Sequence, residues 1–446
     1  MAEEKQGFHR AWLVFIGVCM MMAGGMGLVL NVVGNYFPVM AMAFGLQTPD
    51  GGLDVAPVTL IMTVYSYVML VWLLFVGKLF DKVDARILFG VSGLLIVVAC
   101  LLLSIWTEPW QIYISGAMWG LAGPAIFLVG PSFLINNWFA PSQAGKFIGI
   151  SSAFTGVGTF VWSPVFAGLI ASMGYQTAWR IEACIAAVLI LIPAFFFFRT
   201  RPEDVGLKPW GIEKEAENPK EEAKKSGVSG KFALGTIAFW LILIAAGLIS
   251  LGGGYKSLMP TAVQSIGGPD MAMLGATMVS AGAVGNILGK ILLGFLSDKL
   301  GIRLGMLILI VINAIGFACM FIFLPQCTSV EAAPTAFMLI AGFGIGIADA
   351  EMTVGLPIMT QTCFGTRCYG QIYSYMNMPI AILGGIGATF VAVVANVTGS
   401  FTNAYVCGIA FAVVILVCVF LSVGTASKFR DKWTLEGEPE KSRHAA

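Results

Sequence analysis

Long apolar stretches alternate with short polar breaks along the whole chain. Each stretch reaches the length of about 20 residues that a helix needs to cross the hydrocarbon core of a bilayer. Breaks such as Pro49–Gly52 and Gly267–Asp270 combine turn-forming residues with charge, so we expect helices to end there. The pattern predicts twelve membrane-spanning helices, near residues 11–43, 56–78, 87–106, 110–137, 146–173, 178–198, 232–265, 272–296, 303–324, 333–362, 369–397 and 401–425.

One long hydrophilic segment, residues 200–231, divides the predicted helices into two sets of six. It is rich in lysine and glutamate and mixed in sign, which is typical of a solvated tether between two bundles. We therefore expect an all-α membrane protein with a six-helix bundle at 1–199, a second six-helix bundle at 232–425 and a short tail at 426–446.

The composition excludes several classes of protein. Of the 446 residues, 58% are hydrophobic and only 11% are charged, whereas about a quarter of the residues in soluble domains are charged. A soluble enzyme is therefore not expected, and no basic surface is large enough to bind a nucleic acid. The 9 cysteines show no metal-ligand spacing and only 2 histidines occur, so neither a metal nor another cofactor is expected.

Lysine and arginine are distributed unevenly between alternate loops. All of them except Arg180, Lys256 and Lys290 fall in the two tails, in the central segment from Arg199 to Lys231 and in the loops on one side of the predicted helices. Because loops rich in positive charge stay on the cytoplasmic side, this pattern places both termini and the linker in the cytoplasm. We expect a multi-pass protein of the cell membrane, monomeric in the lipid bilayer.

A similar motif follows the second predicted helix of each half. It consists of a glycine, an aspartate and an arginine, and the spacing between them is the same in both halves: Gly77, Asp81 and Arg86 in the first half, and Gly294, Asp298 and Arg303 in the second. We expect each glycine to allow two helices to approach closely. The charged side chains would hydrogen-bond helix ends and so lock one conformation. Two six-helix halves with matching loops are typical of transporters built from repeats.

This motif resembles the G-x-L-x-D-x-x-G-x-R loop of the major facilitator superfamily, although Asp84 stands where the first copy would have a glycine. The resemblance covers the whole chain and implies two six-helix bundles around a central cavity, working by alternating access. The segments Asn136–Gly149 and Phe364–Gly370 are similar to those of oxalate/formate antiporters, which are related to monocarboxylate transporters. No Walker motif is present, so gradients or exchange, rather than ATP, would drive transport.

Charged residues within the predicted spans are the strongest functional candidates, because each costs about 2.5–3.5 kcal/mol at mid-span. Lys290 lies one turn from Asn286, and the resemblance implies that a cation here binds the substrate carboxylate. The alternative is a structural ion pair, or a lysine that reaches the membrane surface. Lys256 and Tyr255 follow Gly252–Gly254, which favour a bend. Lys256 is expected either at a gate or at the outer interface.

Asp349 and Glu351 are two acids in one predicted helix. They are two positions apart and therefore point to different sides of that helix. One of them is expected to carry a coupled proton, or to form a gating ion pair with Lys290. The alternative is a buried ion pair that holds two helices together.

Neutral polar residues complete the predicted substrate site. In the eleventh span the second cation of the related family falls at Met376 or Asn377, so a substrate with one carboxylate is favoured over a dianion. The further candidates are Tyr373 and Asn377 in that span, Asn31, Asn35 and Tyr36 in the first span, and Tyr65 in the second. Asn31 and Asn35 share a helix face and bind either substrate or a neighbouring helix. Glu182 is expected to pair with Arg180.

The predicted function is secondary active transport of a small organic anion, in particular a monocarboxylate, with proton coupling or anion exchange. The alternative is a proton-coupled exporter of cationic or amphipathic compounds, with Asp349 and Glu351 as the binding acids. No nucleophile and base share a helix face, so an enzyme is not expected. The family resemblance points to a bacterial inner membrane.

Overall fold

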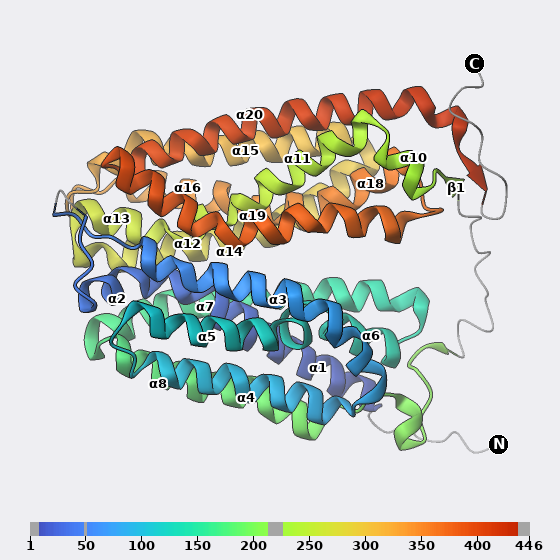
Figure 1. The fold of residues 1–446 in the computed structure, drawn as a ribbon, viewed down its shortest axis with the longest axis horizontal. Helices are drawn as coiled ribbons and strands as arrows, with labels where there is room; N and C mark the ends of the chain where they lie inside the picture. Colours follow the sequence, from blue (N-terminus) through green and yellow to red (C-terminus); the bar gives the residue numbers. More distant parts are fainter. Residues whose placement is uncertain (1–8, 49–50, 213–225, 436–446) are drawn as a thin grey trace. The chain divides into compact units, whose positions relative to one another are not determined.

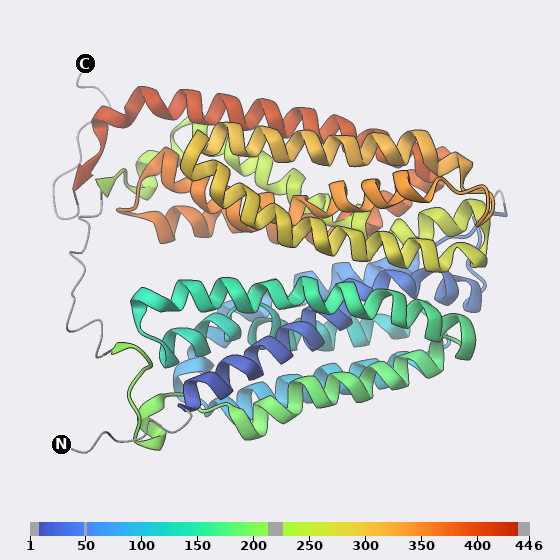
Figure 2. The ribbon, with the colours of Figure 1, turned by 180° about the vertical axis from the view of Figure 1, so that it is seen from behind.

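The computed structural model describes residues 9–48, 51–212 and 226–435, apart from the side chains of residues 78 and 81. Its helices form two compact units, each described here by itself (Figures 1 and 2). The first unit, the N-terminal bundle, contains α1 (Arg10–Met22), η1 (Ala23–Leu30), η2 (Val33–Asn35), α2 (Phe37–Ala43), most of α3 (Ala56–Lys82), α4 (Ala85–Leu103), α5 (Pro109–Gly123), η3 (Pro124–Leu128), α6 (Gly130–Trp138), α7 (Pro141–Met173), α8 (Tyr175–Ala186), η4 (Ala187–Leu191), η5 (Pro193–Phe197) and η6 (Pro202–Val205).

The second unit, the C-terminal bundle, also includes the segment Leu46–Leu60. There the side-chain amide of Asn396 donates a hydrogen bond to Asp54 at 2.7 Å. The elements of this bundle are β1 (Ser226–Gly227), α10 (Gly230–Leu234), α11 (Ile237–Leu251), α12 (Gly253–Ser257), α13 (Met259–Gly267), η7 (Pro269–Met271), α14 (Ala272–Leu300), α15 (Ile302–Phe323), η8 (Leu324–Gln326), α16 (Thr335–Gly346), α17 (Ala348–Ala350), η9 (Glu351–Gly355), α18 (Leu356–Phe364), α19 (Tyr369–Thr398), α20 (Phe401–Ala426), η10 (Ser427–Lys432) and β2 (Thr434–Leu435).

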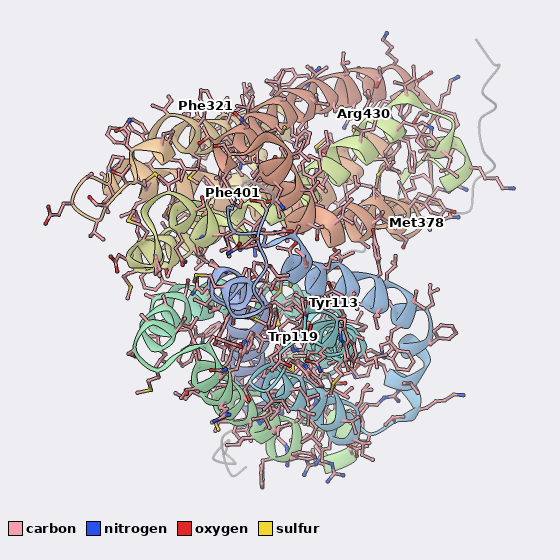
Figure 3. All side chains as sticks on the ribbon, turned by 60° about the vertical axis from the view of Figure 1, so that its left-hand side comes forward. Tyr113, Trp119, Phe321, Met378, Phe401 and Arg430 are labelled. Atoms are coloured by element: carbon pink, nitrogen blue, oxygen red, sulfur yellow. The ribbon has the colours of Figure 1, made fainter. Side chains whose placement is uncertain are left out.

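The predicted number of spans is confirmed. Within the described residues, 12 helical stretches are long and apolar enough to cross a membrane. Large apolar side chains point outward from them: Phe321 and Met378 are 43% and 60% exposed, whereas Trp119 is fully buried in its bundle (Figure 3). A water-soluble surface would not carry so many exposed apolar side chains, so these faces are suited to lipid.

Small residues set the packing of the N-terminal bundle. A Cβ atom at Gly27 would lie 2.8 Å from the carbonyl oxygen of Thr155, and one at Gly158 would lie 2.9 Å from the Cα atom of Ala23. Both positions therefore require glycine, because the backbones of η1 and α7 touch there. This close approach brings the polar side chains that follow on the first span within reach of α7.

The C-terminal bundle uses the same device between α14 and α16. A Cβ atom at Gly346 would overlap the backbone of Gly282, and one at Gly342 would overlap the carbonyl oxygen of Met278. The two helices therefore run in backbone contact. The residues just beyond this contact, Asn286 on α14 and Asp349 on α17, are consequently close enough to bond.

Two spans of the C-terminal bundle are broken near their middle. At the glycine run the regular helix is interrupted, since α11 ends at Leu251 and α12 begins at Gly253. In the tenth span, α16 ends at Gly346 and a wide π-helical turn, η9, begins at Glu351. Such turns leave backbone groups outside the regular pattern and are frequent at functional sites.

The segment 200–231 is folded at both of its described ends. The backbone amide of Trp210 donates to Trp138 at 2.9 Å, and the amide of Ala140 donates to Trp210 at 2.9 Å. At the other end, β1 pairs with β2 in antiparallel fashion. The expectation of a solvated tether along the whole segment is therefore wrong for these ends, because backbone hydrogen bonds join each end to its own bundle. Residues 213–225 lie outside the described residues.

Candidate functional site

Four polar residues from three helices gather inside the C-terminal bundle and form what we call the lysine–aspartate cluster: Lys256 of α12, Asn286 and Lys290 of α14, and Asp349 of α17. The Nζ atom of Lys256 donates to Oδ2 of Asp349 at 2.5 Å. The Nδ2 atom of Asn286 donates to the same oxygen at 3.2 Å. The side chains of Lys256 and Asp349 are only 13% and 26% exposed, so water screens their attraction weakly.

Lys290 is the member of the cluster without a direct partner. It is half-buried and makes no hydrogen bond or ion pair with any residue that the structure describes. Its charge is nevertheless attracted by Asp349 and repelled by Lys256. Asp349 neutralises one of the two lysines, so the cluster keeps one uncompensated positive charge.

The predicted ion pair between Asp349 and Lys290 is wrong for this structure. Asp349 pairs with Lys256 of the short helix α12 instead. Lys256 therefore does not extend to the membrane surface. Sequence spacing cannot reveal this pairing, since the two residues are 93 positions apart.

Glu351 is separated from the cluster, as its position two residues after Asp349 predicts. It is 1% exposed, and its Oε1 atom has no hydrogen-bond partner among the described residues. A small cavity lies beside it and is also lined by Asn313 of α15. Sequence reasoning missed Asn313, although an amide in the middle of an apolar span was a signal for it.

The other predicted site residues of the C-terminal bundle lie apart from the cluster. Tyr255 is fully buried, and its hydroxyl donates to the carbonyl oxygen of Ala404 at 3.0 Å. On α19, Met376 is buried and Asn377 is exposed, and the amide of Asn377 donates to the carbonyl oxygen of Tyr373 at 2.9 Å. Asn377, rather than Met376, is therefore the polar position available on this helix.

The two asparagines of the first span hydrogen-bond α7. Asn31 donates to Thr159 Oγ1 at 2.8 Å, and Asn35 donates to the carbonyl oxygen of Ser163 at 2.9 Å. Both contacts span 128 positions of sequence, so the two residues act one turn apart on the same pair of helices. This arrangement favours the helix-packing alternative over substrate binding. The hydroxyl of Tyr65 donates to the sulfur of Met69 at 3.4 Å.

Tyr36 and Glu182 form a buried pair in the N-terminal bundle. The Tyr36 hydroxyl donates to Oε2 of Glu182 at 2.7 Å, and its ring stacks on Trp179 at 3.8 Å between centroids. The expected pair between Glu182 and Arg180 is wrong, because the Glu182 side chain points into the core. The guanidinium of Arg180 instead approaches Ser104 Oγ at 3.4 Å.

The repeated loop motif behaves differently in its two copies. Arg86 pairs with Asp84 at 3.0 Å, and this guanidinium lowers the pKa of the Asp84 carboxyl below its usual 3.8. Arg303 donates to the carbonyl oxygen of Phe420 at 2.8 Å, while Asp298 is exposed and has no bonded partner among the described residues. The side chain of Asp81 lies outside the described residues.

The glycines of the motif do not serve the role that the spacing suggested. A Cβ atom at Gly77 or at Gly294 would meet no other atom within 4 Å. The expectation that these two glycines allow close helix packing is therefore wrong. Close packing instead occurs at glycines in the middle of the spans, where backbones touch.

Comparison with known proteins places the chain among transporters. The sequence profile of the Major Facilitator Superfamily matches residues 13–388. The chain is 24% identical over 301 residues to the MFS-type transporter pynF of Aspergillus niger, covering 67% of this chain and 63% of that protein. It is 25% identical over 184 residues to the riboflavin transporter RibZ of Clostridioides difficile, covering 41% of this chain and 38% of that protein. The chain thus spans less than two thirds of either relative.

A solved structure is similar over almost the whole chain. The nucleoside transporter NupG has a TM-score of 0.69 and 13% sequence identity, with 93% of this chain and 100% of that chain covered. At this identity the likeness supports the fold alone. The profile and the relatives agree on a membrane transporter rather than an enzyme, and the solved structure agrees in fold.

Proposed function

We propose that this chain, which belongs to the Major Facilitator Superfamily, transports a small organic anion that carries one negative charge. The observation that carries this proposal is the uncompensated charge of Lys290. A lysine held among helices without a bonded partner is costly in a membrane protein, and such residues mark substrate or ion pathways. A carboxylate bound at Lys290 would supply the missing partner.

The composition of the cluster favours a monoanion. Two lysines and one aspartate leave a single positive charge, which one carboxylate would neutralise. The amide of Asn286, which now donates to Asp349, is available as a neutral donor to the same ligand. Lysine presents a compact charge without the planar fork of arginine, so it does not require a ligand that offers two oxygens side by side.

The ion pair between Lys256 and Asp349 gives the bound anion a way to change the protein. An anion held at Lys290 would repel Asp349 and compete for Lys256, and so would weaken a contact between α12 and α17. Both helices are short and begin where a longer helix is interrupted. Binding of the anion would thereby weaken the ion pair between Lys256 and Asp349, and release of the anion would restore it.

Within this proposal the substrate is a monocarboxylate, as in the monocarboxylate branch of the superfamily. Anion exchange or proton coupling drives its transport. The proposal also keeps a monomer in a cell membrane of bacterial type, with both termini in the cytoplasm. The support for the orientation is the uneven distribution of lysine and arginine between loops.

The test is thermal unfolding of the detergent-purified protein with a monocarboxylate (acetate or lactate), a dicarboxylate (oxalate) and an organic cation (tetraphenylphosphonium). A ligand that binds the folded state raises the Tm. At a ligand concentration a hundred times its Kd, the free energy of unfolding increases by about 2.7 kcal/mol. We expect the monocarboxylate to raise the Tm of the wild type and of Lys299→Gln, but not of Lys290→Gln. Lys299 is the matched control, because it lies on the same helix, exposed, outside the cluster.

The alternative function, export of cationic compounds, makes the opposite prediction. It requires a free acid at the cluster, whereas Asp349 is already paired with Lys256 and Glu351 lies apart from the cluster, beside the small cavity. A rise in Tm with tetraphenylphosphonium that disappears in Asp349→Asn and persists in Lys290→Gln would replace the anion proposal with the export function.

A further inference from the structure

A second polar site lies inside the C-terminal bundle, apart from the lysine–aspartate cluster. Glu351 begins the π-helical turn η9 and is 1% exposed. Its carboxyl group makes no hydrogen bond or ion pair with any described residue, and its Oε1 atom is completely buried. Buried polar groups almost always have a partner, so a ligand outside the protein is expected here.

A small internal cavity borders this carboxyl group. Its volume is about 10 Å³, which is the space that one water molecule needs. Its other polar wall residues are Asn313 and Tyr255: the amide of Asn313 uses one of its two N–H groups to donate to Gly344 at 3.1 Å, and the hydroxyl of Tyr255 donates to Ala404 at 3.0 Å. The oxygens of both side chains are suited to accept from a water, and the remaining walls are apolar.

No charged side chain serves as a counter-ion for Glu351 within the part of the chain that the structure describes. Of the helices packed against η9, α11 carries no titratable residue, while Lys290 of α14 and Asp349 of α17 belong to the cluster. The other titratable residues of the surrounding helices do not line the cavity; they are Asp298 and Lys299 of α14, Arg303 and Cys319 of α15, Cys363 of α18, and Tyr405, Cys407 and Cys418 of α20.

These surroundings favour a proton over a metal cation. A hard metal cation takes six or more oxygen ligands, and this cavity offers one carboxyl and two neutral oxygens among apolar side chains. A proton needs only the carboxyl group and a water to deliver it. The neutral acid is also the form of a carboxyl group that apolar surroundings tolerate.

We propose that Glu351, together with one water in this cavity, is the proton-binding site of the transporter. In the binding step, an O–H bond of a hydronium ion breaks and a new O–H bond forms at Oε1, which leaves a neutral acid and a water. Release is the reverse step and needs no other reactant. This proton site rests on the proposed function. It makes the proton the coupling ion and places the proton-binding carboxyl apart from the anion-binding cluster.

The chain supplies a short connection between the two sites. Asp349 and Glu351 are joined by the three-residue helix α17 and the first turn of η9, with helix irregularities on both sides. A displacement of Asp349 when an anion competes for Lys256 therefore moves the backbone that holds Glu351. Substrate binding and proton access are coupled through this segment.

The first experiment uses the full-length protein in liposomes and separates exchange from proton coupling. Exchange of labelled for unlabelled acetate needs no net proton movement, whereas accumulation driven by a pH gradient does. We expect Glu351→Gln to lose pH-driven accumulation at least tenfold while exchange persists, because glutamine mimics the neutral acid. The matched control is Glu182→Gln, which removes an equally buried acid of the other bundle and should keep both activities.

The second experiment is infrared difference spectroscopy of the purified protein in acid and alkali. We expect the carbonyl band of a protonated acid to disappear as the pH rises, and this change to be missing in Glu351→Gln. If that variant does not fold, Ala412→Val serves instead, because it fills the cavity and leaves the acid in place. It should slow pH-driven accumulation at least several-fold relative to exchange.

The outcomes of the two experiments separate the two proposals. If the wild type exchanges no acetate, the proposed substrate class fails, and the infrared titration still decides whether Glu351 binds a proton. Full pH-driven accumulation in Glu351→Gln, or the same infrared change in that variant as in the wild type, would overturn the proton site. Accumulation that follows a sodium gradient and is lost in Glu351→Gln would overturn it as well.

Discussion

The two bundles treat their buried polar residues differently. In the N-terminal bundle, Asn31 and Asn35 donate to α7, and Glu182 accepts from Tyr36, so each of these side chains has at least one partner within the bundle. The second oxygen of Glu182 and the amide oxygen of Asn35 are left without one among the described residues. In the C-terminal bundle, Lys290 and Glu351 have no bonded partner among the described residues. Polar groups that satisfy one another hold helices together, whereas groups without a partner need a ligand. The comparison therefore assigns packing to the first set and binding to the second.

The largest effect is expected where the C-terminal cluster is broken. Replacing Asp349 by Asn leaves the charge of Lys256 without its counter-ion, which costs about 3 kcal/mol for a largely buried pair. Thermal unfolding in detergent would show this as a lowered Tm, and millimolar acetate should restore part of it by binding near the free charge. The double variant Lys256→Met, Asp349→Leu should be more stable than Asp349→Asn. An Asp349→Asn variant as stable as the wild type would show that the ion pair contributes nothing.

A smaller effect is expected from the buried pair of the N-terminal bundle. Replacing Tyr36 by Phe removes the one hydrogen bond to Glu182 and keeps the stacking on Trp179, at a cost of about 1–2 kcal/mol. The KM of acetate exchange should be unchanged, since this pair is assigned to packing. A change in KM without a loss of stability would move Tyr36 from the packing set to the binding set.

The asparagines provide the most direct test of the comparison. Asn35→Ala should cost about 0.6 kcal/mol, the average for a hydrogen bond between membrane helices, and leave the KM for acetate unchanged. Asn286→Ala should raise that KM several-fold, because its amide is a donor within the proposed site. Measurement of exchange kinetics for the two variants side by side distinguishes them. Equal effects on KM would remove the distinction between the bundles.

The smallest effect is expected in the loops that carry the repeated motif. Asp84→Asn keeps a side chain that can cap α4 but removes the exposed ion pair with Arg86, and the loss of stability at neutral pH is small because water screens this pair. Because Arg86 lowers the folded-state pKa of Asp84, the stabilisation is present above pH 3.8 and is lost as the pH falls through the lowered value. Tm measured against pH should show the two proteins converging in acid. Asp298→Asn, which breaks no pair among the described residues, is the control.

The fold follows from the sequence because membrane spans are governed by one simple requirement. A helix must be long and apolar enough to cross the bilayer, and both properties can be read from a window of residues. The candidate site follows in part for a related reason. Charges within apolar spans are rare, so Lys256, Lys290, Asp349 and Glu351 stand out in the sequence alone.

The pairing of these residues cannot be derived from the sequence. Spacing favours Lys290 as the partner of Asp349 and Arg180 as the partner of Glu182, whereas the actual partners are Lys256 and Tyr36. In each case the actual partner lies on another helix, more than 90 positions away in the chain. Which helices pack against one another therefore decides the pairing.

By itself, the sequence determined the number of spans and their division into two sets. It also identified the charged residues within the spans of the second set as functional candidates, because a charge inside a bilayer is costly. Only the tertiary structure decided that one lysine is neutralised and the other is not, and that one acid faces the cluster while the other faces a cavity the size of a water. The physical reason is that hydrophobicity is a sum over neighbouring residues, whereas the environment of a buried charge depends on the few atoms within bonding distance.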